Sequence, residues 1–217
     1  MNFTLRNHGF LIVLLLAPSA ALAQDTPPKF ELFAEGGSST VNNKSNVQDV
    51  IVSVNPTVVL ASTVTSHLSP TGRLFVGARF FFRPSEAVEF SYSYAPTDFT
   101  ITVVEPTFPT PTVMRGRPAS VDEHMFSLNY VRAFRTNARL RPFFTFGVGG
   151  VYWKLISFNS PGFAGNFGGG LDYSLSSHWS VRTEYRDFLL EYPQGSAGGP
   201  TGLSHNQMAA AGFVFRF

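Results

Sequence analysis

The chain lacks cysteine, is poor in charge and contains only one long apolar run. Its 217 residues include no Cys, which excludes disulfides, thiolate metal sites and cysteine nucleophiles. Charged residues make up 14% of the chain, whereas an ordinary soluble domain has roughly 25%. After residue 23, no stretch reaches the roughly 20 consecutive apolar residues that a membrane helix needs. These absences argue against a helical membrane protein, and a net charge of only +2 gives no sign of a nucleic-acid partner.

Aromatic residues and glycine are abundant instead. The chain has 23 Phe, 7 Tyr and 2 Trp, so aromatic residues make up 15% of it, and it has 19 Gly. Its mean hydropathy of +0.06 is too polar for a bundle of membrane helices. A membrane β-barrel has this mixture, because only every second residue of each strand faces lipid.

The apolar run near the N-terminus has the layout of a secretory signal peptide. Arg6 gives a positive start, an apolar run of eight residues begins at Phe10, and a small-x-small cleavage site ends at Ala23. We therefore predict that residues 1–23 are removed by cleavage near Ala23, with an uncleaved N-terminal anchor as the alternative. Residues 24–217 are then the mature protein.

Alternation of apolar and polar residues predicts eight strands, each of about the 9–11 residues that a tilted membrane strand needs. The segments that show this alternation are residues 29–37, 74–82, 88–94, 126–130, 141–153, 163–174, 181–185 and 206–217. Short and long connections alternate between them, as in a barrel with short periplasmic turns and long outer loops. The sequence thus predicts an all-β fold, an eight-stranded antiparallel up-and-down transmembrane β-barrel with long loops at about 38–73 and 97–122.

Alternatives to this fold remain open at the sequence level. The Val- and Ile-rich residues 48–66 fit either a hairpin above the membrane or two more spanning strands, so ten strands are possible. Residues 97–122 are rich in Thr, Pro and Val, and their prolines predict an extended loop without a regular ladder. A soluble up-and-down barrel, with its apolar face inside and its charges outside, is the alternative to a membrane barrel.

The C-terminus carries the most specific motif of the chain. Phe217 is terminal, Phe213 and Phe215 alternate before it, and Gly212 stands sixth from the end. These four residues resemble the outer-membrane β-signal that the barrel assembly machinery reads. Together with the eight strands, they make the chain similar to the small outer-membrane β-barrel superfamily typified by the OmpA transmembrane domain and OmpX.

The resemblance implies a location and partners. It places the mature chain in the outer membrane of a Gram-negative-type bacterium, with outer-membrane lipid and the barrel assembly machinery as partners. It implies no single activity, because this family shares a fold rather than a function.

The same alternation predicts which charged side chains point into the barrel. Eight strands leave an interior just wide enough for side chains to fill it. Unpaired charge is costly there, so we expect ion pairs that plug the lumen. A narrow ion pathway along the same residues is the alternative. The nine predicted lumen residues are Glu31, Glu35, Arg79, Glu89, Asp172, Arg182, Glu184, Arg186 and Arg216.

Tyrosines and tryptophans fall near the predicted strand ends, where a ring with a polar edge suits the membrane interface. We predict that they form an aromatic girdle. Its expected members are Tyr92, Tyr94, Tyr130, Tyr152, Trp153, Tyr173 and Trp179.

An enzyme is the weakest of the interpretations. A lipid-modifying barrel would use His with Ser or Asp near its outer rim, and the candidate pairs are His124 with Ser127 and His205 with Ser204. The first pair has i, i+3 spacing, which on a strand puts the two side chains on opposite faces. The second pair falls in a predicted Gly-rich loop. We therefore predict no catalytic residue, no cofactor, no metal site and no nucleic-acid partner.

Taken together, these patterns predict a non-enzymatic outer-membrane barrel with a structural or surface-interaction role, whose surface ligand the sequence does not identify. A small, low-conductance pore is the alternative function.

Overall fold

The computed structural model describes residues 29–42, 48–55, 58–105, 112–115, 119–134, 138–155, 159–191 and 203–217. The predicted signal peptide lies outside these residues. In the described ranges, no helix is long and apolar enough to span a membrane. The strands are β1 (Phe30–Asn42), β2 (Gln48–Asn55), β3 (Val58–Leu68), β4 (Thr71–Arg83), β5 (Glu86–Glu105), β6 (Thr112–Arg115), β7 (Ala119–Ala133), β8 (Leu140–Lys154), β9 (Asn159–Ser174), β10 (Trp179–Glu191) and β11 (Leu203–Arg216).

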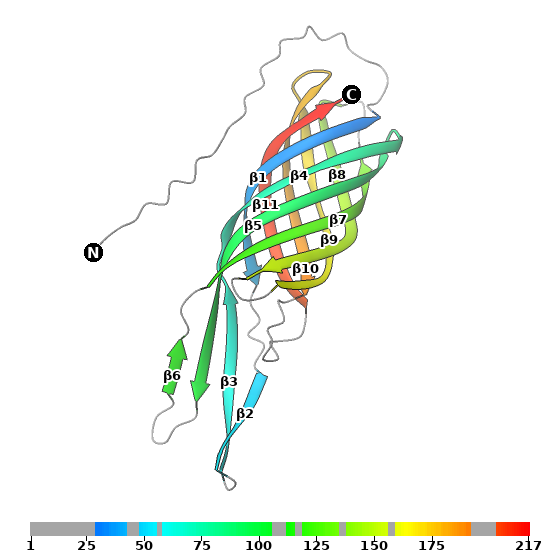
Figure 1. Ribbon diagram of the computed structural model, residues 1–217. Coiled ribbons are helices and arrows are strands. Elements are labelled where there is room, and N and C mark those ends of the chain that lie inside the picture. Colours follow the sequence, from blue (N-terminus) through cyan, green and yellow to red (C-terminus); the bar gives the residue numbers. More distant parts are fainter. Residues whose placement is uncertain are drawn as a thin grey trace, which may run out of the picture.

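Eight of these strands close into an antiparallel barrel (Figure 1). β1 pairs with β4, β4 with β5 and β5 with β7. The ring continues through β8, β9 and β10 to β11, which pairs with β1. Each of the eight barrel strands therefore has a paired neighbour on both sides, as a spanning sheet requires. The prediction of eight strands is confirmed.

The other three strands, β2, β3 and β6, lie outside the barrel. With the end of β5, residues 99–105, they form an antiparallel sheet in the order β2-β3-β5-β6, here called the projecting sheet. It extends from the end of the barrel opposite the C-terminus (Figure 1). Residues 48–66 thus contribute a hairpin beyond the barrel rather than two more barrel strands.

Two segments predicted to be loops contain long strands. In the first, residues 38–73, β1 continues to Asn42 and β4 begins at Thr71, with β2 and β3 between them. In the second, residues 97–122, β5 continues to Glu105 and β7 begins at Ala119. The prolines misled the prediction, because the β-branched run of residues 100–104 finds a partner strand on either side. Pro106, Pro109, Pro111 and Pro118 all fall outside the described residues.

The barrel presents its apolar side chains outward and its charges inward. This arrangement is the reverse of a soluble barrel and leaves a wide apolar belt that only lipid covers. The exposed apolar side chains of the barrel include Leu32, Leu74, Phe80, Phe90, Phe126, Leu128, Phe144, Phe146, Val148, Phe167, Leu171 and Phe213.

Trp153 corrects the predicted aromatic girdle. Its side chain is only 1% exposed and lies inside the barrel, where its Nε1–H donates to the backbone oxygen of Glu191 at 3.0 Å. Neighbouring Tyr152 points outward. Strand alternation explains the difference, because adjacent residues cannot both face the membrane.

The barrel closes where the two ends of the chain's described part meet. The backbone N–H of Phe217 donates to the oxygen of Phe30 at 3.0 Å, and the two rings lie 5.5 Å apart. Phe213 is exposed, whereas Phe215 packs against Trp179 with ring centroids 4.9 Å apart. The predicted assembly motif therefore lies on the closing strand, and its recognition by the assembly machinery stays a prediction.

Candidate functional site in the barrel lumen

All nine predicted lumen residues are buried inside the barrel. The pairing register places charges of opposite sign on neighbouring strands. Glu89 of β5 lies opposite Arg79 of β4, and Arg79 lies opposite Glu31 of β1. Glu31 in turn lies opposite Arg216 of β11. The signs alternate from strand to strand, and opposite charges in such cross-strand positions attract one another.

A second row of alternating charge follows on the other side of the barrel. Arg141 of β8 lies opposite Asp172 of β9, and Asp172 lies opposite Arg182 of β10. The next position is Gly212 of β11, and beyond it lies Glu35 of β1. A Cβ atom at Gly212 would lie 2.5 Å from the Glu35 Cα, so only glycine fits between these strands.

Arg182 is the centre of the first ion-pair cluster. Its Nε donates to Asp172 Oδ1 at 2.6 Å, and its Nη2 donates to Glu31 Oε2 at 3.3 Å. Arg141 also contacts both carboxylates, with Asp172 Oδ2 at 2.8 Å. Arg216 donates to Glu31 at 3.1 Å. Three arginines from three strands thus share two carboxylates.

Glu89 is the centre of the second cluster. Its Oε2 accepts from Arg79 Nε at 2.5 Å, and its Oε1 accepts from Arg186 at 3.0 Å. Asn129 donates to the same Oε1 at 2.9 Å. Arg186 also pairs with Glu184, two residues away on β10. This cluster connects β4, β5, β7 and β10 across the lumen.

Glu35 is the exception among the predicted residues. Neither of its carboxylate oxygens has a hydrogen-bond partner. The nearest guanidinium nitrogen is Arg182 Nη1, at 3.9 Å from Oε1. The structure therefore places Glu35 in the lumen but brings it only to the edge of the network.

Three charged lumen residues were missed by the sequence analysis. Arg141 completes the first cluster, while Arg73 and Glu123 form a separate pair at 2.8 Å nearer the projecting sheet. Strand alternation could have identified two of them, because Arg73 lies two residues from inward Phe75 and Arg141 lies two residues from inward Phe143. Within the described barrel strands, the buried inward charges are then six arginines and six carboxylates. They are Arg73, Arg79, Arg141, Arg182, Arg186, Arg216, Glu31, Glu35, Glu89, Glu123, Asp172 and Glu184.

Aromatic rings fill the space between the charges. The guanidinium carbon of Arg79 lies 4.1 Å from the Phe143 ring centroid, and that of Arg182 lies 4.9 Å from it. Arg186 lies 4.6 Å from the Phe75 ring. Arginine stacks on rings with little hydration. The interior is therefore packed rather than aqueous at the level of the ion pairs.

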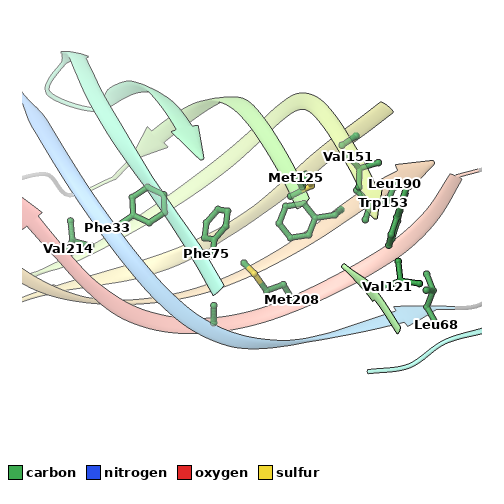
Figure 2. Packing of buried hydrophobic residues seen from close by; sticks show 13 residues of the cluster. Phe33, Leu68, Phe75, Val121, Met125, Val151, Trp153, Leu190, Met208 and Val214 are labelled. Atoms are coloured by element: carbon green, nitrogen blue, oxygen red, sulfur yellow. The ribbon is translucent and has the colours of Figure 1, made fainter. Parts of the chain in front are cut away.

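Buried apolar side chains run along the lumen beside the ion pairs and continue toward the projecting sheet. Figure 2 shows the buried cluster running from Val214 and Phe33 past Phe75 to Leu68 and Trp153. Beside Trp153 and Leu190, the space between the side chains is too small for a water molecule. Charge pairs thus occupy the middle of the lumen, and apolar side chains occupy the end nearer the projecting sheet.

Within the described barrel strands, the ladder between β4 and β5 is interrupted at a seam near the projecting sheet. The pairing of β4 with β5 ends at Leu74 and Tyr94, and ladder pairing on this side of β5 resumes at Leu68 and Phe99, between β3 and β5. Isolated hydrogen bonds cross the interval, such as that from the Ser69 N–H to the Asp98 oxygen at 3.0 Å. Pro96 lies in the interval and has no N–H to donate. A concavity of about 800 Å³ opens here, lined by Gly36, Gly72, Leu74, Tyr94, Pro96 and Thr97 among others.

The two candidate catalytic pairs are not assembled. His124 accepts or donates a hydrogen bond with Tyr92 at 2.8 Å on the outer face, whereas Ser127 faces the lumen and contacts Ser91. His205 is half exposed and contacts Asp187 at 2.9 Å, while Ser204 is buried on the other face. Both members of the second pair lie on β11, not in a loop, and adjacent strand residues point apart.

The barrel is closed, its outer belt is apolar and its interior is charged. These three features together define an outer-membrane β-barrel protein. Residues 9–217 match the outer membrane protein beta-barrel domain family, and the chain belongs to this family. The family places the protein in the bacterial outer membrane. No curated protein matches the sequence.

Several solved structures share the fold. The outer membrane protein OprG from Pseudomonas aeruginosa is 17% identical, with a TM-score of 0.53 over 88% of this chain and 97% of that one. Neisserial surface protein A is 9% identical, with a TM-score of 0.52 over 87% and 97% of the two chains. The outer membrane protein AlkL, solved in lipid bilayers, is 16% identical, with a TM-score of 0.50 over 93% and 97%. At these identities the likeness shows the fold alone.

Proposed function

We propose that this protein is a non-enzymatic outer-membrane barrel that acts through its exposed end, with its lumen sealed by ion pairs. The balanced network of six arginines and six carboxylates carries this proposal. Charges that neutralise one another in a packed interior leave no excess of one sign to select or attract ions. Short turns mark the periplasmic side in such barrels, so the projecting sheet would face the exterior.

The sealed lumen predicts that the barrel does not conduct. Protein refolded into a planar lipid bilayer is expected to give no steady current above that of the bare membrane. Heat-modifiable mobility on gels would verify that the barrel is folded in the same preparation. Steady conductance of the native protein would contradict the sealed lumen and would favour the alternative function, a low-conductance pore.

The seam between β4 and β5 favours a second candidate function, passage of small apolar molecules through the barrel wall. The concavity there is lined by outward residues such as Leu74 and by inward residues such as Thr97. Arg73, which pairs with Glu123, also lines the concavity, whereas the clusters centred on Arg182 and Glu89 do not. A route from the exposed end to the lipid-facing surface would therefore bypass these two clusters. This route is compatible with a non-conducting lumen.

Filling the concavity tests that second function. An added Cβ at Gly36 meets nothing within 4 Å, so Gly36→Phe is expected to fold and to occupy the space. Cells carrying Gly36→Phe should take up the apolar dye N-phenylnaphthylamine several-fold more slowly than cells with the native chain. Gly150→Phe, at an exposed glycine outside the concavity, is the matched control. Equal uptake with the native chain and Gly36→Phe would remove this function.

A further inference from the structure

The projecting sheet has one long, unprotected edge. Within the described residues, β2 pairs only with β3, so the other side of its backbone is free. At the opposite edge, β6 has only four residues. Proteins usually protect an exposed edge with lysine, proline or a very short strand. The eight residues of β2, Gln48–Asn55, contain neither lysine nor proline and carry a single charge, Asp49.

The sequence of β2 is nearly symmetric about Ile51. Residues 49–53 read Asp-Val-Ile-Val-Ser, with the apolar residues in the middle and a polar residue at either end. In an antiparallel pair of two copies centred on Ile51, Val50 faces Val52 and Asp49 faces Ser53. No carboxylate then faces another carboxylate, and the like-charge penalty of cross-strand pairs is absent. The β2 edge is therefore complementary to itself.

Membrane orientation decides where the second copy sits. All copies in one membrane point the same way, so two neighbours are related by an axis along the membrane normal. β2 and β3 extend away from the barrel end (Figure 1), and such an axis would make two β2 strands run in the same direction. Antiparallel pairing needs a two-fold axis perpendicular to the strands. Copies in two facing membranes meet that requirement.

We propose that the β2 edge binds the β2 edge of a second copy on a facing outer membrane. The two projecting sheets then join into one continuous sheet with the order β6-β5-β3-β2-β2-β3-β5-β6. Backbone hydrogen bonds give such strand addition its affinity, and the side-chain register gives its specificity. This inference rests on the proposed function, because it names the partner that the exposed end would contact, and it assigns the protein a homophilic role in contact between cells.

A charge-swap experiment tests the contact. Two differently labelled cell populations express the full chain, and mixed clusters are counted. Ile51→Lys and Ile51→Glu should each reduce clustering to the level of cells without the protein, because like charges then face each other. Mixing Ile51→Lys cells with Ile51→Glu cells should restore it. Ala61→Lys is the matched control, since Ala61 lies opposite Ile51 on β3, one strand away from the edge, and should cluster like the native chain.

A single introduced cysteine gives an independent measurement. The chain has no Cys, so Ile51→Cys chains carrying two different tags, one in each population, should form a disulfide-linked dimer that contains both tags. Ala61→Cys should not. Native cells that fail to cluster, unchanged clustering of Ile51→Lys, no recovery on mixing, or dimers with one tag only would each overturn the proposal. Bilayer conductance separately tests the sealed lumen. A failure of the β2 contact therefore does not imply a failure of the sealed lumen, and the reverse also holds.

Discussion

Replacing Arg182 by alanine is expected to lower the free energy of unfolding by about 3 kcal/mol, the lower end of the range for breaking a buried ion pair. The change removes the hydrogen bonds to Asp172 and Glu31 and the packing against Phe143. The loss stays near the lower end because Arg141 still contacts both carboxylates. Denaturant titration of the barrel in lipid, followed by gel mobility, measures the change.

Two variants serve as controls for this loss. Arg132→Ala removes a pair between a half-exposed arginine and Glu86 near the short turns, and exposed pairs contribute only about 0–1 kcal/mol. Glu35→Gln changes a lumen carboxylate that has no hydrogen bond to lose, so it should destabilise the barrel far less than Arg182→Ala. Arg182→Ala with native stability but altered ion selectivity would mean that the charges line a pore.

Arginine placed on the lipid-facing side of the barrel is expected to cost about 2–4 kcal/mol near the bilayer midplane. Phe126 and Phe90 are 50% and 55% exposed on the outer belt and suit this test. Phe126→Leu, which keeps the site apolar, should leave stability nearly unchanged. Phe215→Arg should cost less, because Phe215 lies at the end with the short turns beside Trp179, where the penalty near the interface falls to about 0–1 kcal/mol.

The inward neighbour of Phe126 does not provide a cheap site for the same arginine. Ser127 is buried and hydrogen-bonds to Ser91 at 2.7 Å, so lumen water does not relieve a new charge there. An arginine at Ser127 would overfill the packed interior, which is expected to lower the free energy of unfolding by about 1–3 kcal/mol. The decisive comparison is therefore Phe126→Arg with Phe126→Leu, and equal stability of these two variants would show that the strand face is assigned wrongly.

These predictions assign different roles to two parts of the molecule. In the proposed function, the barrel is an anchor whose lumen is sealed by ion pairs, and the projecting sheet carries the only long strand edge among the described strands. Variants in the lumen should therefore change stability without changing cell clustering, whereas variants at Ile51 should do the reverse.

The sequence by itself determined the number of barrel strands and the direction of their side chains. Strand alternation has a period of two, so Glu31 and Leu32 must face opposite sides wherever the strand lies. The same rule placed all nine predicted charges inside. It failed at Trp153, where residue type was weighted above parity, and at residues 99–105, where nearby prolines hid a strand whose partners are distant in the chain.

Only the tertiary structure decided which charge meets which. Glu31 and Arg182 are far apart in the sequence. Their contact at 3.3 Å depends on the register between β1 and β11, the two strands that close the barrel. Parity fixes the face of a residue but not its height relative to residues on other strands. That height brings Arg141 to both Glu31 and Asp172 and leaves Glu35, opposite Gly212, without a hydrogen bond. The tertiary structure also decides that β2 pairs with β3 outside the barrel and has one free edge among the described strands.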